Sequence, residues 1–258
     1  MLALTADTVV DLRRSMLVHG GGVFETVHVH RGVPLFLAAH LRRMGEGLAL
    51  LGMPPAPPEA AVREFLGRFL RERGLRETGL RLVAVDDRLV VLERELYPRP
   101  ASVALGLARD VRRCTRAALT GVKSTSYLEN RLLTRRAAAA DLFDTLALNE
   151  HERLTDGGRC NVMLALDGAL VTPPLADGCL PGVTRGVLLA AGAVTERPLT
   201  VADLERAAGA CVTSSLAGVL PVHAVAGVTT FDPDHPLVRA AAAAYAAAVA
   251  AEIAGREG

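Results

Sequence analysis

The sequence lacks a surplus of positive charge and a long apolar run. Its formal net charge is +1 and its pI is about 7.8, which argues against a nucleic-acid-binding protein, because such binding rests mainly on neutralising phosphates. The longest apolar tract, 240–251, is mostly alanine, contains Tyr245 and is followed by Glu252. It falls short of the roughly 20 apolar residues that a membrane span needs. We therefore expect a terminal helix, and neither nucleic acid nor membrane as a partner.

The sequence also lacks paired cysteines. Its four cysteines, Cys114, Cys160, Cys179 and Cys211, form no CxxC motif, which fits neither a disulfide framework nor a zinc site. His28 and His30 share one face of an expected strand but have no evident third ligand in the sequence, so we predict no metal site. Residues 1–11 carry acidic residues where a signal peptide is positively charged, which indicates a cytoplasmic protein.

The third scarcity is lysine. The 29 basic residues comprise 28 arginines and a single lysine, Lys123. Arginine stays protonated in proteins, whereas a desolvated lysine amine can react with a carbonyl group. A Schiff-base role would explain why one lysine is retained, although a lone lysine at an indifferent surface position is the ordinary alternative.

Half of the residues are hydrophobic, so 258 residues can bury a sizeable core. We predict a β-hairpin from 23–30 and 33–36 around Arg31 and Gly32, because a short polar turn separates two strand-like runs. Apolar residues at helical spacing predict a helix from Leu37 to Leu51, and a second helix is expected over 58–73. Further strands are expected at 80–85, 89–92 and 103–108.

A change of charge suggests a boundary after these elements. Residues 1–116 contain 18 arginines and 13 acidic residues, whereas 117–258 contain 11 basic and 15 acidic residues. We expect a small N-terminal α+β domain at 1–110, a basic linker at 111–121 and a larger domain at 122–258. In the larger domain the patterns predict helices at 126–140, 184–191 and from Leu237, and strands at 145–149, 161–166, 169–171 and 210–213.

Six short blocks then occur in an order typical of one enzyme family. The blocks are Gly20-Gly21-Gly22-Val23-Phe24-Glu25-Thr26, His40-Leu41-Arg42-Arg43, Lys123-Ser124-Thr125-Ser126-Tyr127-Leu128-Glu129-Asn130, Leu154-Thr155-Asp156-Gly157 with Asn161-Val162, Leu180-Pro181-Gly182-Val183-Thr184-Arg185, and Thr213-Ser214-Ser215. In this order the chain resembles the fold type IV pyridoxal-phosphate enzymes. These include branched-chain and D-amino acid aminotransferases and aminodeoxychorismate lyase.

The resemblance implies an α+β fold of two domains, the larger one with a mixed, barrel-like sheet, and pyridoxal 5'-phosphate as cofactor. It implies that Lys123 forms the Schiff base with the cofactor and then moves protons. Asp156 stands where the family has a glutamate that pairs with the pyridine nitrogen. Its side chain is one methylene shorter, and a turn aspartate before Gly157 is the alternative.

The remaining candidates concern the phosphate and the ring. Val183 and Thr184 open a helix whose free N–H groups can bind phosphate, although Thr184 can also simply cap that helix. The resemblance adds Arg43, Ser214 and Ser215 on the phosphate side, Leu180 against the ring, and Tyr127 on the phenolic oxygen. Alternatives are a solvated helix face for Arg43 and a core-edge position for Tyr127. Gly20, Gly21 and Gly22 lack the context of a dinucleotide-binding loop, so we expect close backbone packing there.

Within this family, the stretch 213–222 resembles aminodeoxychorismate lyase, in which Ser-Leu-x-Gly-Val is usual. The implied reaction converts 4-amino-4-deoxychorismate, a small-molecule substrate, into 4-aminobenzoate and pyruvate. The alternatives are a branched-chain or D-amino acid aminotransferase, and a degenerate relative that only binds cofactor, since Asp156 and Gly21 depart from the family pattern. The resemblance also implies a homodimer. The arginine-glycine pair of the family is replaced by Asp86-Asp87-Arg88, so no carboxylate-binding residue is predicted.

Overall fold

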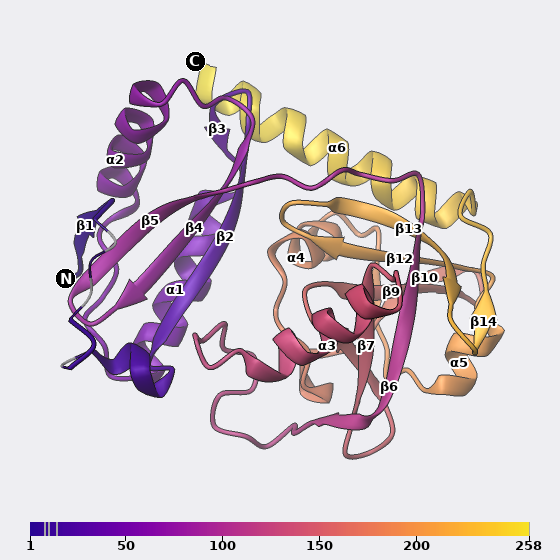
Figure 1. The fold of residues 1–258 in the computed structure, drawn as a ribbon. Coiled ribbons are helices and arrows are strands. Elements are labelled where there is room, and N and C mark those ends of the chain that lie inside the picture. The colour runs from indigo at the N-terminus through magenta and orange to yellow at the C-terminus, as the bar shows by residue number, and fades with distance from the viewer. Residues whose placement is uncertain (8, 10, 14, 258) are drawn as a thin grey trace. The chain divides into compact units, whose positions relative to one another are not determined.

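The computed structural model describes residues 1–7, 9, 11–13 and 15–257 and divides the chain into two units. Unit 1 comprises Met1–Tyr97, Val122–Tyr127 and Val249–Gly258, and unit 2 comprises Pro98–Gly121 and Leu128–Ala248. Figure 1 shows the elements of each unit. Both contain helices and a mixed sheet, as expected for an α+β chain of two domains.

Unit 1 is built on a five-stranded sheet in the order β1-β5-β4-β2-β3. Its strands are β1 (Ala3–Thr5), β2 (Gly22–His30), β3 (Val33–Pro34), β4 (Thr78–Val85) and β5 (Arg88–Arg94). The predicted hairpin is confirmed, with Arg31 and Gly32 both at positive φ (53° and 81°), as a two-residue turn of this kind requires. Strand β3 ends at Pro34, earlier than predicted, because Phe36 already adopts a left-handed conformation (φ 52°) before the next helix.

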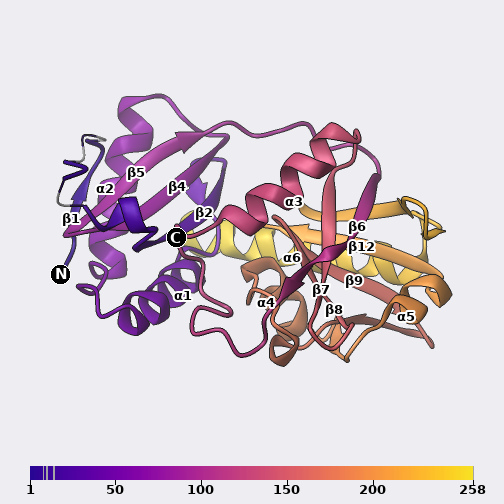
Figure 2. The same ribbon diagram turned by 60° about the horizontal axis from the view of Figure 1, so that its bottom comes forward.

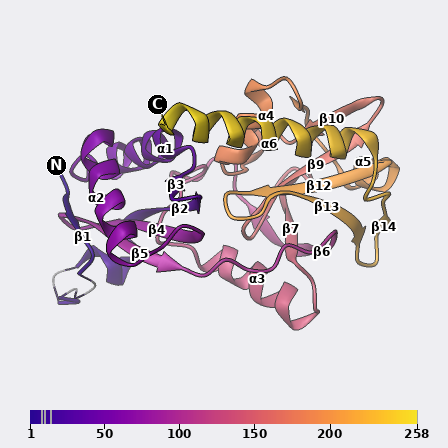
Figure 3. The same ribbon diagram turned by 90° about the horizontal axis from the view of Figure 1, so that it is seen from above.

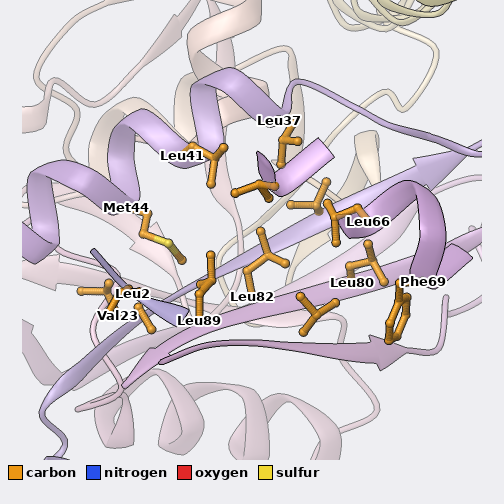
Figure 4. Packing of buried hydrophobic residues seen from close by; sticks show 14 of the residues in the cluster. Leu2, Val23, Leu37, Leu41, Met44, Leu66, Phe69, Leu80, Leu82 and Leu89 are labelled. Atoms are coloured by element: carbon orange, nitrogen blue, oxygen red, sulfur yellow. The ribbon is translucent and has the colours of Figure 1, made fainter. Parts of the chain in front are cut away.

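Two helices, α1 (Leu37–Leu50) and α2 (Glu59–Glu72), cover one face of this sheet, and Figure 3 shows both on the same side of the strands. The predicted stripe of α1 is buried: Leu37, Met44 and Leu48 are at most 2% exposed. These side chains pack with Leu66 of α2 and Leu82 of β4 (Figure 4). Burying each such side chain is worth about 1.5–3 kcal/mol, so this core holds both helices on the sheet.

Unit 2 contains a nine-stranded sheet in the order β11-β10-β9-β12-β13-β6-β7-β8, with β14 paired to β13. Because β8 also pairs with β9 through Asp156 and Asn161, six of the strands close into a ring, which confirms the barrel-like sheet. The strands are β6 (Val103–Arg113), β7 (Asp144–Asn149), β8 (Leu154–Gly157), β9 (Asn161–Leu166), β10 (Ala169–Thr172), β11 (Thr195–Glu196), β12 (Gly209–Ser214), β13 (Gly218–Val225) and β14 (Thr229–Thr230).

The helices of unit 2 are close to their predicted positions. They are α3 (Leu128–Ala139), α4 (Val183–Ala190), α5 (Val201–Arg206) and α6 (Pro236–Glu257), and α6 ends in unit 1. Each unit also contains a short 3-10 helix, η1 (Met16–His19) in unit 1 and η2 (Leu175–Asp177) in unit 2. Helix α3 packs on β6 and β7 through Leu133 and Ala137 (Figure 2). Helix α5, not predicted, begins at a capping box formed by Thr200 and Asp203.

The boundary between the units differs from the expected one at residue 110. Strand β6 was expected in the first domain, but it pairs in parallel with β7 and β13 and therefore belongs to unit 2 from Pro98 onward. It also extends to Arg113, into the expected linker. Residues 122–127 return to unit 1. Strand β6 pairs with residues about 40 positions away in β7 and about 120 positions away in β13, so local patterns do not reveal this pairing.

Strand β13 is not among the predicted strands. It contains Pro221, and proline is uncommon in the interior of a sheet. In the structure Pro221 is opposite Cys211 of β12, while pairing with β6 begins only at Val222. The proline therefore lies just before the part of β13 that is paired on both sides.

Helix α6 contains one stretch, Pro236–Gly255, that is long and apolar enough to cross a membrane by length and composition, with a mean hydropathy of 1.5. The expected tract of 240–251 was therefore too short. One stripe of this helix is nonetheless buried against the rest of the protein, at Val238, Ala241, Tyr245 and Ile253. A stripe at helical spacing is typical of a packed amphipathic helix, so the stretch is weak evidence for a membrane span.

Candidate active site

The segment that carries Lys123 is hydrogen-bonded to the edge of strand β2. The Phe24 N–H donates to the Lys123 carbonyl (2.9 Å), and the Thr125 N–H donates to the Gly22 carbonyl (2.8 Å), while Val23 and Ser124 form a bridge. A Cβ at Gly22 would lie 2.7 Å from the Ala84 carbonyl oxygen. The expected close backbone packing at these glycines is confirmed, and it brings the Lys123 segment onto the sheet.

The Lys123 amine lies among aromatic rings. Its Nζ donates to the Tyr127 hydroxyl (3.3 Å) and lies 4.5 Å from the ring centroid of Phe24. The rings of Phe24 and Tyr127 meet edge to face at 5.0 Å. Tyr127 thus contacts the lysine directly. Lys123 as a whole is half-buried.

The opposite face of β2 carries a buried ionic cluster. Glu25 is fully buried and accepts hydrogen bonds from His40 Nδ1 (2.7 Å) and from Arg43 Nε (2.8 Å) and Nη2 (2.5 Å). Burial alone would raise the pKa of Glu25, but the Arg43 charge and the His40 hydrogen bond outweigh it and lower the pKa to about 2. Burial lowers the pKa of His40, so its imidazole is neutral at pH 7 and donates to the carboxylate.

Sequence reasoning missed this cluster. Glu25 and His40 belong to quoted blocks, yet they received no role, and Arg43 was expected at the phosphate. The structure shows that Glu25 orients the Arg43 guanidinium by a bidentate pair, and such pairs fix geometry strongly. A charged residue in the middle of the buried face of β2 was the available signal, because an isolated buried carboxylate is costly.

In unit 2, Asp156 holds the segment before helix α4. Asp156 is buried, and its Oδ2 accepts the Leu180 N–H (2.9 Å), while Asn161 Nδ2 donates to the Leu180 carbonyl (2.9 Å). Asp156 and Asn161 are cross-strand partners, so they hold the backbone N–H and the carbonyl group of the same residue, Leu180. Asp156 Oδ1 also lies 3.4 Å from Arg113 Nε, a residue that sequence reasoning had placed in the basic linker.

The row of paired residues continues to Thr213. Thr213 of β12 is opposite Asn161, so the side chains of Asp156, Asn161 and Thr213 share one face of the sheet. Thr213 is 2% exposed, and its hydroxyl has no hydrogen-bond partner among residues 1–7, 9, 11–13 and 15–257. Buried hydroxyls normally have a hydrogen-bond partner, so this one is a candidate for a contact with a bound ligand.

Apart from Arg43, the residues expected at the phosphate lie in two segments of unit 2, and both segments contact Tyr245. Helix α4 begins at Gly182, which has no side-chain cap, and its first turn contains no acidic residue. Buried Thr184 hydrogen-bonds the Tyr245 phenol; burial raises the pKa of that phenol and the Thr184 hydrogen bond partly offsets this. Gly218 (φ 68°) closes the turn after β12, and a Cβ there would lie 2.9 Å from the Tyr245 ring. The sequence pattern indicates Tyr245 only as a polar residue within the apolar tract 240–251, and gives no sign of these contacts.

The two serines expected on the phosphate side, Ser214 and Ser215, lie at the turn after β12. Ser214 Oγ accepts the Ala217 N–H (3.3 Å), and Ser215 is half-buried in the turn. The predicted residues therefore divide between the units: Arg43, Lys123 and Tyr127 belong to unit 1, and Asp156, Leu180, Val183, Thr184, Ser214 and Ser215 belong to unit 2.

Comparison with known proteins agrees with this geometry. Residues 22–225 match the model of the class IV amino-transferase family, and the chain belongs to that family. It is 27% identical to a putative branched-chain-amino-acid aminotransferase of Methanocaldococcus jannaschii, over 86% of this chain and 84% of that protein. It is also 27% identical to a bifunctional aminodeoxychorismate lyase and D-amino acid transaminase of Mycobacterium tuberculosis, over 81% and 83%.

The fold matches solved structures. One is a putative 4-amino-4-deoxychorismate lyase from Legionella pneumophila, with a TM-score of 0.87 and 24% identity over 95% of this chain and 98% of that one. The family consists of pyridoxal-phosphate enzymes, so the chain is one of them and its cofactor is pyridoxal 5'-phosphate. The residues present fit this group: an amine at Lys123, an uncapped helix start free of acidic residues at Gly182, and the buried Thr213 hydroxyl.

The buried Glu25 cluster predicts a stability effect. Glu25→Gln should lower the free energy of unfolding by about 3–5 kcal/mol at pH 7, because Arg43 is left with an uncompensated charge. The pKa of Glu25 is about 2 when folded against 4.5 for an ordinary glutamate. The ionised Glu25 carboxylate therefore contributes its full stabilisation of the folded state above pH 4.5, and this contribution is lost as the pH falls toward 2.

Urea unfolding midpoints of the wild type and of Glu25→Gln, taken at pH 7 and at pH 3, measure this loss of stability. The difference between the two midpoints should be smaller at pH 3 than at pH 7. Glu46→Gln, an exposed position on the same helix as His40 and Arg43, is the matched control. Equal midpoints for the two variants at pH 7 would contradict the prediction.

Proposed function

We propose that the protein is an aminodeoxychorismate lyase, which converts 4-amino-4-deoxychorismate into 4-aminobenzoate and pyruvate, a step of folate biosynthesis. The observation that carries the enzymatic proposal is the only lysine, with its amine beside Tyr127 and Phe24. The choice of lyase is supported by the stretch Ser215-Leu216-Ala217-Gly218-Val219 and by the Mycobacterium tuberculosis relative whose name includes that activity.

The second candidate is an aminotransferase acting on branched-chain or D-amino acids, which the Methanocaldococcus jannaschii relative favours. A degenerate relative without activity is a third candidate, suggested by the departures at Gly21 and Asp156. Local packing explains Gly21, because a Cβ there would lie 2.8 Å from the Met16 Cβ. An aspartate would not fit at that position without movement of Met16, so this departure is weak support for lost activity.

The reaction needs a base at the carbon that bears the substrate amine. Bound pyridoxal 5'-phosphate supplies an aldehyde that condenses with amines and a ring that withdraws electrons from the adjacent carbon. Lys123 Nζ removes the proton from C4 of the substrate. The enolpyruvyl C–O bond then breaks, the ring becomes aromatic, and the proton held by Lys123 is returned to the leaving group as it becomes pyruvate. No further reactant is required.

Tyr127 and Phe24 support Lys123 in this role. The Tyr127 hydroxyl hydrogen-bonds the amine, which limits its rotation, and the Phe24 ring contributes an apolar wall that excludes water.

Arg81 supplies a positive charge for the substrate. The Arg81 guanidinium carbon and Lys123 Nζ each lie 4.5 Å from the same Phe24 ring centroid, so the two cationic groups are at most about 9 Å apart. Two cations on one ring repel each other, and an anionic substrate between them relieves that repulsion. We propose that Arg81 binds a substrate carboxylate, the role for which no residue was found in the sequence.

On the cofactor side, we propose that Asp156 serves the pyridine nitrogen, that Leu180 lies against the ring, and that Val183, Thr184, Ser214, Ser215 and Arg43 serve the phosphate. The uncapped start of helix α4 supports the phosphate role, because a helix N-terminus attracts anions. The contact with Arg113 supports the presence of an ionised carboxylate at Asp156.

The first test concerns Lys123 and the reaction. Borohydride reduction of the holoenzyme followed by peptide mapping should find the cofactor on Lys123, and Lys123→Arg should abolish turnover. Product analysis with aminodeoxychorismate, beside a panel of amino acids and oxo acids, should then give 4-aminobenzoate and pyruvate. An adduct elsewhere refutes the site, whereas transamination alone refutes the lyase and leaves the site intact.

A second prediction concerns Asp156→Asn. The amide retains an oxygen for the Leu180 N–H, so the cofactor should stay bound, but proton removal should slow. Losing a charge-assisted contact of about 1.5–3 kcal/mol corresponds to a rate decrease of roughly 10- to 150-fold. Cofactor absorbance and single-turnover rates measure the two effects, and Asp141→Asn at an exposed turn is the control. Unchanged turnover would assign Asp156 to the Leu180 contact alone.

A third prediction concerns Arg81→Gln. It should lower kcat/KM roughly 10- to 150-fold, mainly through KM, with normal cofactor loading, because one ionic hydrogen bond to the substrate is lost. Arg94→Gln, which removes a charge from an exposed position of the same sheet, should have little effect. If KM is unchanged in Arg81→Gln, a different residue binds the carboxylate.

We further propose a homodimer, as the family resemblance implies, and a cytoplasmic location, which the four free thiols fit because disulfides are rare in that compartment. Light scattering at working concentration should give about twice the mass of the chain. A monomer that is fully active would exclude the dimer as the functional form.

A further inference from the structure

Strand β2 ends in two histidines beside a glutamate. His28 and His30 are alternate residues and therefore project from one face of the strand, the same face as Phe24. The register pairs His28 with Gly79 and Val29 with Thr78, which brings Glu77 opposite His30. One ligand atom from each of the three side chains lies within 4.8 Å of the others. The third ligand, which the sequence did not reveal, is thus supplied by strand pairing.

The three side chains are already held in place. Glu77 Oε1 accepts the Arg31 N–H (2.9 Å), and Oε2 lies 3.0 Å from His30 Nδ1. The two imidazole rings have centroids 5.9 Å apart. His28 is buried, whereas the side chains of His30 and Glu77 are 36% and 51% exposed. One ligand is therefore anchored in the protein, and the other two are open to an ion from solvent.

The charge of Glu77 suits a cation. Its carboxylate lies beside the two imidazole groups, with one ligand atom of each side chain within 4.8 Å of the others, and half of its side chain is exposed to solvent. Arg31 lies next to His30 in the sequence, but it contributes its backbone N–H to the carboxylate.

We propose that His28, His30 and Glu77 form a binding site for a divalent transition-metal ion of the zinc class. Zinc binds histidine nitrogen at about 2.0–2.1 Å and carboxylate oxygen at about 2.0–2.2 Å in tetrahedral sites, and two histidines with one glutamate leave a fourth position for water. Imidazole ligands also disfavour magnesium and calcium, which prefer oxygen.

The distances are compatible with a small adjustment. Ligand atoms on one tetrahedral zinc ion are about 3.3 Å apart. The contact between His30 and Glu77 is already that short, so only the His28 ring has to approach, by roughly 1.5 Å from the 4.8 Å limit. Rotation about side-chain bonds provides such a movement.

The ion would join the β2–β3 hairpin to the start of β4. Phe24 and His28 are four residues apart on one strand, about 13 Å at the usual rise per residue, so the site is separate from the Lys123 amine. The proposal concerns a structural site and does not depend on the lyase proposal. An ion that binds only the folded state should stabilise the protein.

The test uses the tag-free holoenzyme with free cofactor removed and with Cys114→Ser, because Cys114 is an exposed thiol that can bind zinc. Titration with Zn²⁺ by calorimetry, and with Co²⁺ by visible absorbance, should give one ion per chain with micromolar affinity and a thermal midpoint raised by several degrees. His28→Gln, His30→Gln and Glu77→Gln should each weaken binding at least tenfold. His151→Gln, at an exposed histidine of unit 2, should not.

Circular dichroism and the metal-free thermal midpoint show that each variant is folded, and a variant that does not fold is replaced by the corresponding asparagine variant. No binding at millimolar Zn²⁺, or an affinity unchanged in all three variants, would overturn the proposal. Binding that needs the histidines but survives Glu77→Gln unchanged would also overturn it, because the site would then be a histidine pair. Turnover of aminodeoxychorismate is measured separately, so failure of the lyase proposal leaves this result unaffected.

Discussion

Two backbone hydrogen bonds determine where the only lysine of this protein lies. They join Phe24 and Gly22 of strand β2 to the segment that begins at Lys123. The same segment also comes close to the chain just before β2, because a Cβ at Gly20 would lie 2.9 Å from the Ser126 Cβ. The segment that carries the lysine is thus positioned by main-chain hydrogen bonds, and side-chain contacts with Tyr127 and Phe24 place its amine.

Strand β2 then serves two different environments. On the face toward α1, Glu25 forms a buried ionic cluster with His40 and Arg43, and on the other face Phe24 contacts the Lys123 amine and the Arg81 guanidinium. Strand alternation makes this division possible, since neighbouring residues project to opposite faces. The ionic cluster of Glu25 thus lies on one face of the strand, and the aromatic contact of the Lys123 amine lies on the other.

In unit 2 the ring of six strands closes at a single residue pair, Asp156 and Asn161. Both side chains hold the Leu180 peptide, and a Cβ at Gly182 would collide with the Asn161 amide oxygen at 2.0 Å. The start of helix α4 is therefore positioned by the closure of the barrel. The shorter aspartate has a clear local function here, which the comparison with a family glutamate alone did not suggest.

Local patterns in the sequence were enough to predict the β2–β3 hairpin, helices α1 and α2, and strands β7, β9, β10 and β12, because periodicity and residue composition act over a few residues. The family blocks were enough for the fold type. The tertiary structure alone decided that β6 belongs to unit 2, that Glu25 joins His40 and Arg43, that Arg113 meets Asp156, and that Glu77 faces His28 and His30. Each of these features depends on contacts between residues that are distant in the chain. A buried charge in particular is stable only beside such partners, so its position follows from the tertiary structure.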